Sequence, residues 1–112
     1  MTPPRILVVD DEPNSLFGIC QVLKDEGYRV IPAENGNQAL EKFQNHPVDI
    51  IITDMKMPDM SGMALFSAVK KTGGQVPVIL ITAYGSVSLA VEALKQGIYS
   101  FFEKPIFNNL ER

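Results

Sequence analysis

Four short apolar runs in this sequence each lead into polar side chains of the kind that bind metal ions and phosphate. Asp54 follows residues 50–53 and precedes a loop marked by Pro58 and Gly62. The other runs lead into the acidic pair Asp10 and Asp11, into Thr82 and into Lys104. Taken singly, these residues have ordinary roles: a helix cap for either acid of the pair, a turn residue for Asp54, a strand former for Thr82 and a solvated charge for Lys104.

Brought together, the same side chains could perform phosphoryl chemistry. Carboxylates a few ångströms apart repel one another unless a cation lies between them, and an all-oxygen ligand set with a loop carbonyl favours Mg²⁺ over zinc. A hydroxyl, an ammonium group and a metal ion would stabilise the negatively charged oxygens of a transferred phosphoryl group. Asp54 would then be the nucleophile, with Thr82 and Lys104 beside it.

The elements that must position these residues alternate along the chain. Apolar runs predict strands over residues 5–9, 28–31, 48–53, 76–82 and 98–102. The first intervening helix begins at Pro13 and ends before Gly27, because its apolar residues recur at helical spacing: Leu16, Ile19, Cys20 and Leu23.

Three further helices are predicted between the later strands. They run from the turn at Asn35 and Gly36 to about residue 44, from about residue 63 to the breaker at Thr72, and from an N-cap at Ser86 to Gly97. For the last of them we expect an apolar stripe made of Val87, Ala90, Val91 and Leu94.

This alternation predicts an α/β fold with a parallel sheet that helices cover on both faces. The carboxyl ends of parallel strands share one edge, where ligands bind in open α/β sheets. The piece after the fifth strand, residues 105–112, is too short for a covering helix. We therefore expect one domain over residues 1–112, cut from a longer protein.

Composition excludes several classes of function. The 112 residues are 46% hydrophobic and 21% charged, which is typical of a globular domain. A net charge of −3 gives no field that would attract nucleic acid, so any DNA contact needs another domain. No apolar run is long enough to span a membrane and no signal peptide is evident, so we expect a cytoplasmic location with Cys20 as a core thiol.

The motifs taken in order resemble those of the receiver domain of two-component response regulators. VVDDE at residues 8–12 is similar to the acidic pair of that family, and TDMKMPDMSG at residues 53–62 to its phosphoacceptor loop. ITA at residues 81–83 matches the switch threonine, and KP at residues 104–105 the lysine turn. The resemblance implies a flavodoxin-like, doubly wound five-stranded sheet of order 2-1-3-4-5 with a truncated last helix.

The resemblance also implies a role for each site residue. Asp54 would accept a phosphoryl group from a sensor histidine kinase. Asp11, Asp54 and the backbone carbonyl of Lys56 would ligate Mg²⁺, and Asp10 would act on the metal through water. Thr82 and Lys104 would hold phosphoryl oxygens, and the Lys104–Pro105 bond is expected to be cis.

Three features characterise this sequence within the family. Phe101 stands three residues before Lys104, where many receivers have a tyrosine, so a switch there lacks a hydroxyl to hydrogen-bond. Residues 83–105 resemble receivers of the nitrogen-regulatory type, which precede an ATPase that activates transcription and a DNA-binding domain. The resemblance also implies that Lys56 and Tyr84 lie over the phosphoryl group, and neither is an acid or amide that could orient a hydrolytic water.

The main hypothesis is a signalling switch, in which phosphorylation acts through Thr82 and Phe101 to create a new contact surface and a homodimer. Such a domain assists its own phosphotransfer and dephosphorylation but is not an enzyme. The first alternative is an aspartyl-phosphate phosphatase of the haloacid-dehalogenase kind, which would require an acid in place of Lys56 and a cap insertion. The second is a degenerate receiver that serves only for docking, which would be favoured if site residues were missing.

Overall fold

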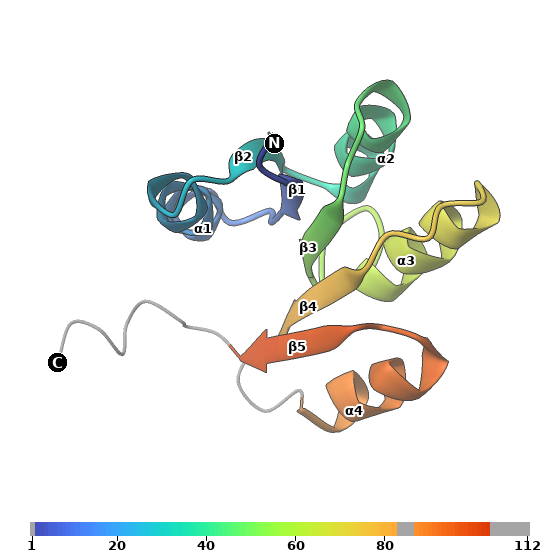
Figure 1. The fold of residues 1–112 in the computed structure, drawn as a ribbon. Helices are drawn as coiled ribbons and strands as arrows, with labels where there is room; N and C mark the ends of the chain where they lie inside the picture. Colours follow the sequence, from blue (N-terminus) through green and yellow to red (C-terminus); the bar gives the residue numbers. More distant parts are fainter. Residues whose placement is uncertain (1, 83–86, 104–112) are drawn as a thin grey trace, which may run out of the picture.

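The computed structural model describes residues 2–82 and 87–103, and these form a parallel sheet flanked by helices (Figure 1). The strands lie in the order β2-β1-β3-β4-β5, as predicted. Their bounds are β1 Arg5–Val9, β2 Arg29–Ala33, β3 Ile50–Asp54, β4 Val78–Thr82 and β5 Ser100–Glu103. The helices are α1 Pro13–Asp25, α2 Gly36–Asn45, α3 Gly62–Lys71 and α4 Val87–Gln96.

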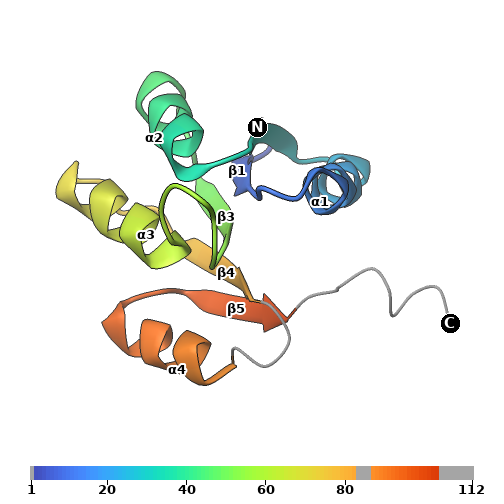
Figure 2. The ribbon, with the colours of Figure 1, turned by 180° about the vertical axis from the view of Figure 1, so that it is seen from behind.

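Two apolar layers hold the helices to the sheet. Helices α2, α3 and α4 lie on one side and α1 lies on the other, as the two opposite views show (Figures 1 and 2). The larger layer joins β1, β3 and β4 to α2, α3 and α4. It contains the fully buried residues Leu7, Ile51, Leu65 and Leu80. The smaller layer places Leu16, Ile19 and Cys20 of α1 against β1 and β4. The predicted doubly wound fold is therefore confirmed.

Local signals explain where the helices begin. Pro13 is the first residue of α1, and the Glu12 side chain accepts the Asn14 N–H at 2.7 Å. The N-cap of this helix is therefore Glu12, and neither Asp10 nor Asp11 has that role. Asn35 and Ser61 cap α2 and α3 in the same way. Capping by other residues leaves both aspartates available for other chemistry.

Several predictions about the elements were wrong in detail. Strands β3, β4 and β5 each begin two residues later than predicted. Strand β2 runs on through Pro32 to Ala33, because β2 is an edge strand and a proline there removes no ladder hydrogen bond on the outer side. In α4, Val91 and Leu94 are 43% and 37% exposed, whereas Ala90 and Ala93 are buried. The small alanines let α4 approach the core closely, so Val91 and Leu94 of the predicted stripe face outward.

The single cysteine is a core residue, as predicted. Cys20 lies in the layer between α1 and the sheet, and its thiol is buried. Burial raises the pKa of the Cys20 thiol, and the charge of Lys24 opposes this only in part. A thiol with a raised pKa is a poor nucleophile, so Cys20 contributes packing. No helix in residues 2–82 and 87–103 is long and apolar enough to cross a membrane.

Candidate functional site

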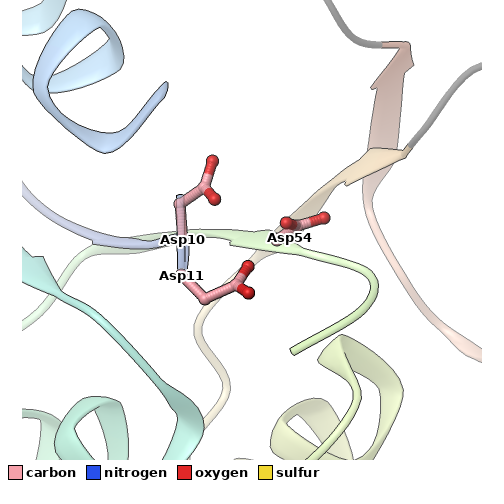
Figure 3. Close-up of side chains that lie close together, drawn as sticks. All are labelled: Asp10, Asp11 and Asp54. Carbon is pink, nitrogen blue, oxygen red and sulfur yellow. The ribbon is translucent and has the colours of Figure 1, made fainter. Parts of the chain in front are cut away.

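The register of the central strands brings the predicted acids together. Val9 of β1 pairs with Thr53 of β3, so Asp10 and Asp54 follow at the same level of the sheet. One carboxylate oxygen from each of Asp10, Asp11 and Asp54 lies within 4.8 Å of the others. Figure 3 shows the three side chains gathered where β1 and β3 end. The predicted juxtaposition is therefore present in the structure.

The two acids of the pair sit in different environments. Asp10 is 1% exposed, its backbone N–H donates to the Ala33 carbonyl at 3.1 Å, and its Oδ1 accepts the Glu12 N–H at 2.9 Å. Asp11 is exposed. The hydrogen bonds fix Asp10 in place, whereas Asp11 can turn its carboxylate toward an incoming ligand.

Asp54 is held at the mouth of the sheet by its neighbours. Asp54 as a whole residue is 8% exposed. The Thr53 hydroxyl donates to the Asp54 carbonyl at 3.0 Å, and the next N–H, that of Met55, donates to the Ile81 carbonyl at 2.9 Å. These bonds fix the backbone on both sides of Asp54 and leave its carboxylate beside those of the acidic pair.

The donor set fits a hard divalent cation. Three carboxylates offer oxygen ligands only, and no histidine or cysteine among the described residues belongs to this cluster. Like charges this close destabilise one another unless a cation lies among them. Oxygen ligands with room for water are what Mg²⁺ prefers.

The residues predicted to act as a switch lie on β4 and β5. Thr82 is fully buried, and its hydroxyl donates to the Phe102 carbonyl at 3.5 Å. Asp54 pairs with Ile81 in the register, so Thr82 lies one residue beyond Asp54 at the same sheet edge. Phe101 is half-buried and packs against the core layer that contains α4. Thr82 therefore contacts β5, and Phe101 lies in the same apolar layer as Ala90 and Ala93 of α4.

Of the remaining predicted site residues, the structure describes only Lys56. Lys56 is exposed and borders a hollow of about 300 Å³ between the loop after β3 and α4, lined also by Met55, Met63, Leu89 and Ala93. Lys104, Pro105 and Tyr84 lie outside the described residues. The cis bond and the roles of Lys104 and Tyr84 therefore stay predictions.

Sequence reasoning missed one residue near the site. The Asp59 carboxylate accepts the Gly36 N–H at 3.0 Å and the Asn37 N–H at 2.8 Å, at the start of α2. The sequence shows an acid in the loop, but no local pattern connects it to Gly36 and Asn37, which precede it by 23 and 22 positions. Only the packing of α2 beside α3 reveals this pairing.

These bonds give Asp59 a defined pH dependence. The Asn37 and Gly36 N–H groups hold the pKa of Asp59 below its ordinary value of 3.8. A lowered folded-state pKa stabilises the fold above the ordinary pKa, and this stabilisation is lost as the pH falls through the lowered value.

We therefore expect wild type and Asp59→Asn to differ in unfolding free energy by a constant amount from about pH 7 to about pH 5. The difference should shrink below about pH 4. Urea denaturation at several pH values measures it. A difference that grows in acid would contradict the assignment.

Comparison with known proteins gives a consistent result. The family profile described as the response regulator receiver domain matches residues 6–111. The chain is 41% identical over 104 residues to the transcriptional regulatory protein GlrR of Escherichia coli (strain K12), which covers 93% of this chain and 23% of GlrR. It is 39% identical over 106 residues to a putative response regulator NtrX-like of Rickettsia bellii (strain RML369-C), covering 93% and 22%.

A solved structure shows the same fold. The response regulator protein TrrA of Thermotoga maritima, crystallised in complex with Mg²⁺–BeF, superposes with a TM-score of 0.81 and is 35% identical. The match covers 96% of this chain and 93% of that one. This chain thus spans about a quarter of the length of regulators such as GlrR but nearly all of the matched TrrA chain.

Proposed function

This chain belongs to the response regulator receiver domain family, and from that premise we propose that it is a phosphorylation-dependent switch whose phosphoacceptor is Asp54. Receiver domains are signalling domains that sensor histidine kinases phosphorylate, and the resemblance to the nitrogen-regulatory type is confirmed by the relatives. The observation that carries the proposal is the meeting of Asp10, Asp11 and Asp54 at one sheet edge.

In the proposed reaction, a carboxylate oxygen of Asp54 attacks the phosphorus of a phosphohistidine. The new O–P bond forms as the N–P bond to the kinase imidazole breaks. Thr82 and Lys104 would hold the phosphoryl oxygens by a hydroxyl and an ammonium group. The protein thus contributes position and charge.

Mg²⁺ would be held by Asp11, Asp54 and the Lys56 carbonyl, with Asp10 acting through water. When bound, it supplies positive charge beside the phosphoryl oxygens. The TrrA complex with Mg²⁺–BeF, a receiver 35% identical to this chain, supports the same cofactor here. The hydrogen bond from Glu12 N–H to Asp10 also supports the indirect role of Asp10, because it already engages one of that residue's oxygens.

Phosphorylation would change the surface around α4 and β5. The added charge at Asp54 would draw the Thr82 hydroxyl away from Phe102, and Phe101 would adjust its packing against α4. Several apolar side chains are already exposed on these elements: Leu89, Val91, Leu94 and Phe102. Exposed apolar residues favour protein contact, so a homodimer through this surface is part of the proposal.

The proposed output is control of transcription. GlrR is a transcriptional regulatory protein, and this chain covers 23% of its length. Any DNA contact would come from a domain beyond these residues, and a cytoplasmic location belongs to the same proposal.

Metal dependence tests the proposed function. We expect the wild type to gain one phosphoryl group from acetyl phosphate with Mg²⁺, and none once the metal is chelated. We also expect Asp11→Ala to raise the Mg²⁺ Kd more than Asp10→Ala, because only Asp11 is a direct ligand. Intact-protein mass spectrometry and calorimetric titration measure the two effects. Equal losses of affinity would overturn the assignment of ligands, and labelling without metal would overturn the mechanism.

The lifetime of the phosphorylated state is a separate prediction. Hydrolysis needs a water in line with the bond from phosphorus to Asp54, and Lys56 can pair with the phosphoryl oxygens and cover them. Lys56→Asn combined with Tyr84→Glu should therefore speed the loss of phosphate about tenfold, or about 1.4 kcal/mol in the barrier. The decay is followed by mass spectrometry after removal of the phosphodonor. Unchanged decay would mean that both side chains point to solvent.

A further inference from the structure

We propose that Asp59 is a positioning residue for the phosphoacceptor site. By binding the first N–H groups of α2, it holds the loop of residues 55–61 in the shape that presents the Lys56 carbonyl to the cation. The inference rests on the proposed function, because it concerns the Mg²⁺ site formed with Asp54.

The loop is fixed at both ends by short-range bonds. Where it leaves β3, the Met55 carbonyl accepts the Gly62 N–H at 2.8 Å, which closes the loop. Where it enters α3, the Ser61 hydroxyl accepts the Ala64 N–H at 3.0 Å. Between these points Lys56 is exposed, and the half-buried Met57 side chain packs against the core, where its Sδ lies 3.9 Å from the Thr53 hydroxyl.

Asp59 links the loop to a second element, α2. Its two carboxylate oxygens accept the N–H groups of Gly36 and Asn37, which are the first two residues of α2. The first N–H groups of a helix have no partner within the helix, and an anion there is favoured by the helix dipole. The first turn of α2 contains no acidic residue, and Asn35 caps only the Gln38 N–H. The anion at this helix terminus thus comes from the loop after β3.

A second contact lies next to the first. The Met60 side chain passes so close to Gly36 that a Cβ there would lie 2.1 Å from Met60 Cγ. Met60 also packs against the core layer shared by α2, α3 and α4. Together with Asp59, it attaches two consecutive loop residues to α2.

This attachment bears on the metal site through the loop backbone. A carbonyl must point at the cation to bind it, and ordering a free backbone costs conformational entropy. A loop held in advance avoids that cost when the cation binds. Asp59 lies only three residues after Lys56, so releasing it frees the segment that carries the proposed ligand.

The competing explanation is that Asp59 only caps α2. A variant series separates the two. Asp59→Asn removes the charge and weakens both bonds. Asp59→Asn combined with Gln38→Glu returns a carboxylate to the first turn of α2, where the Gln38 side chain already accepts the Glu34 N–H at 2.9 Å. Negative charge thereby returns to this helix terminus without the link to the loop. Glu41→Gln is the matched control, because it removes one charge from an exposed side chain of the same helix.

Three measurements are made on each variant: the Mg²⁺ Kd from an amide NMR titration, the thermal midpoint, and the amide shifts of Gly36 and Asn37. We expect Asp59→Asn to raise the Mg²⁺ Kd about tenfold, the lower end of the effect of losing an outer-shell partner. The double variant should recover the thermal midpoint but not the Mg²⁺ affinity, and Glu41→Gln should change neither.

Two results would overturn the inference. If Asp59→Asn binds Mg²⁺ as tightly as Glu41→Gln, the loop does not need the attachment. If Gln38→Glu restores affinity together with stability, Asp59 is a helix cap only. A wild type that binds no Mg²⁺ would overturn the proposed function as well, so the wild-type titration separates that failure from one confined to Asp59.

Discussion

Asp54→Asn is expected to take up no phosphoryl group from acetyl phosphate under conditions that label the wild type. An amide nitrogen or oxygen is too weak a nucleophile for this transfer, and the substitution also removes one carboxylate from the cluster that would hold Mg²⁺. The change is nearly isosteric, so the fold should be kept. Intact-protein mass spectrometry measures the uptake.

Asp25→Asn is the matched control for this experiment. It makes the same chemical change at an exposed position at the end of α1, where the Asp25 carboxylate contacts only the Gln21 amide among the described residues. We expect Asp25→Asn to be labelled like the wild type. Equal labelling of the wild type and Asp54→Asn would show that another residue is the acceptor.

Gly62→Ala is expected to destabilise the protein by about 1 to 3 kcal/mol, the usual cost of overpacking, and to impair phosphorylation. A Cβ at Gly62 would lie 2.5 Å from the Asp54 carbonyl oxygen and 2.9 Å from Leu80 Cδ2. The backbone oxygen cannot move without shifting Asp54 itself. Inside an ordinary helix, a glycine-to-alanine change stabilises the protein by about 0.5 to 1 kcal/mol. A destabilising effect at Gly62 would therefore have the opposite sign.

Gly36→Ala provides the comparison. Both glycines are the first residue of a helix, and neither has a positive φ. At Gly36 the obstructing atoms belong to the Met60 side chain, which can adopt another rotamer at the expense of its own contact with α2, without any movement of the backbone of Asp54. We expect Gly36→Ala to lower the free energy of unfolding, measured by urea denaturation, by clearly less than Gly62→Ala does. Equal free energies of unfolding for the two variants would contradict the importance of the Asp54 carbonyl.

The sheet could be predicted because its signals are local. Short apolar runs such as residues 5–9 gave the strand at its observed bounds, and Pro13 marked the first residue of α1. The meeting of Asp10 with Asp54 follows from parallel register, which places the ends of neighbouring strands together. Motif order then pointed to the receiver family before any contact was known.

Features that depend on packing between distant segments could not be predicted. The periodicity of α4 allowed either of two apolar faces, and the close approach of Ala90 and Ala93 to the core selected one of them. The bonds from Asp59 to α2 have no sequence signature, because they join a loop to a helix terminus more than 20 residues away. The proline in β2 was tolerated only because that strand lies at the sheet edge.

Locating the phosphoryl group on the wild-type chain tests the central claim most directly. An aspartyl phosphate is an acyl phosphate, so borohydride reduces it to homoserine and leaves unmodified carboxylates intact. We expect peptide mass spectrometry after acetyl phosphate, Mg²⁺ and borohydride treatment to find homoserine at position 54 and aspartate at positions 10 and 11. Homoserine at either of those positions, or at none of the three, would contradict the assignment of Asp54 as the phosphoacceptor.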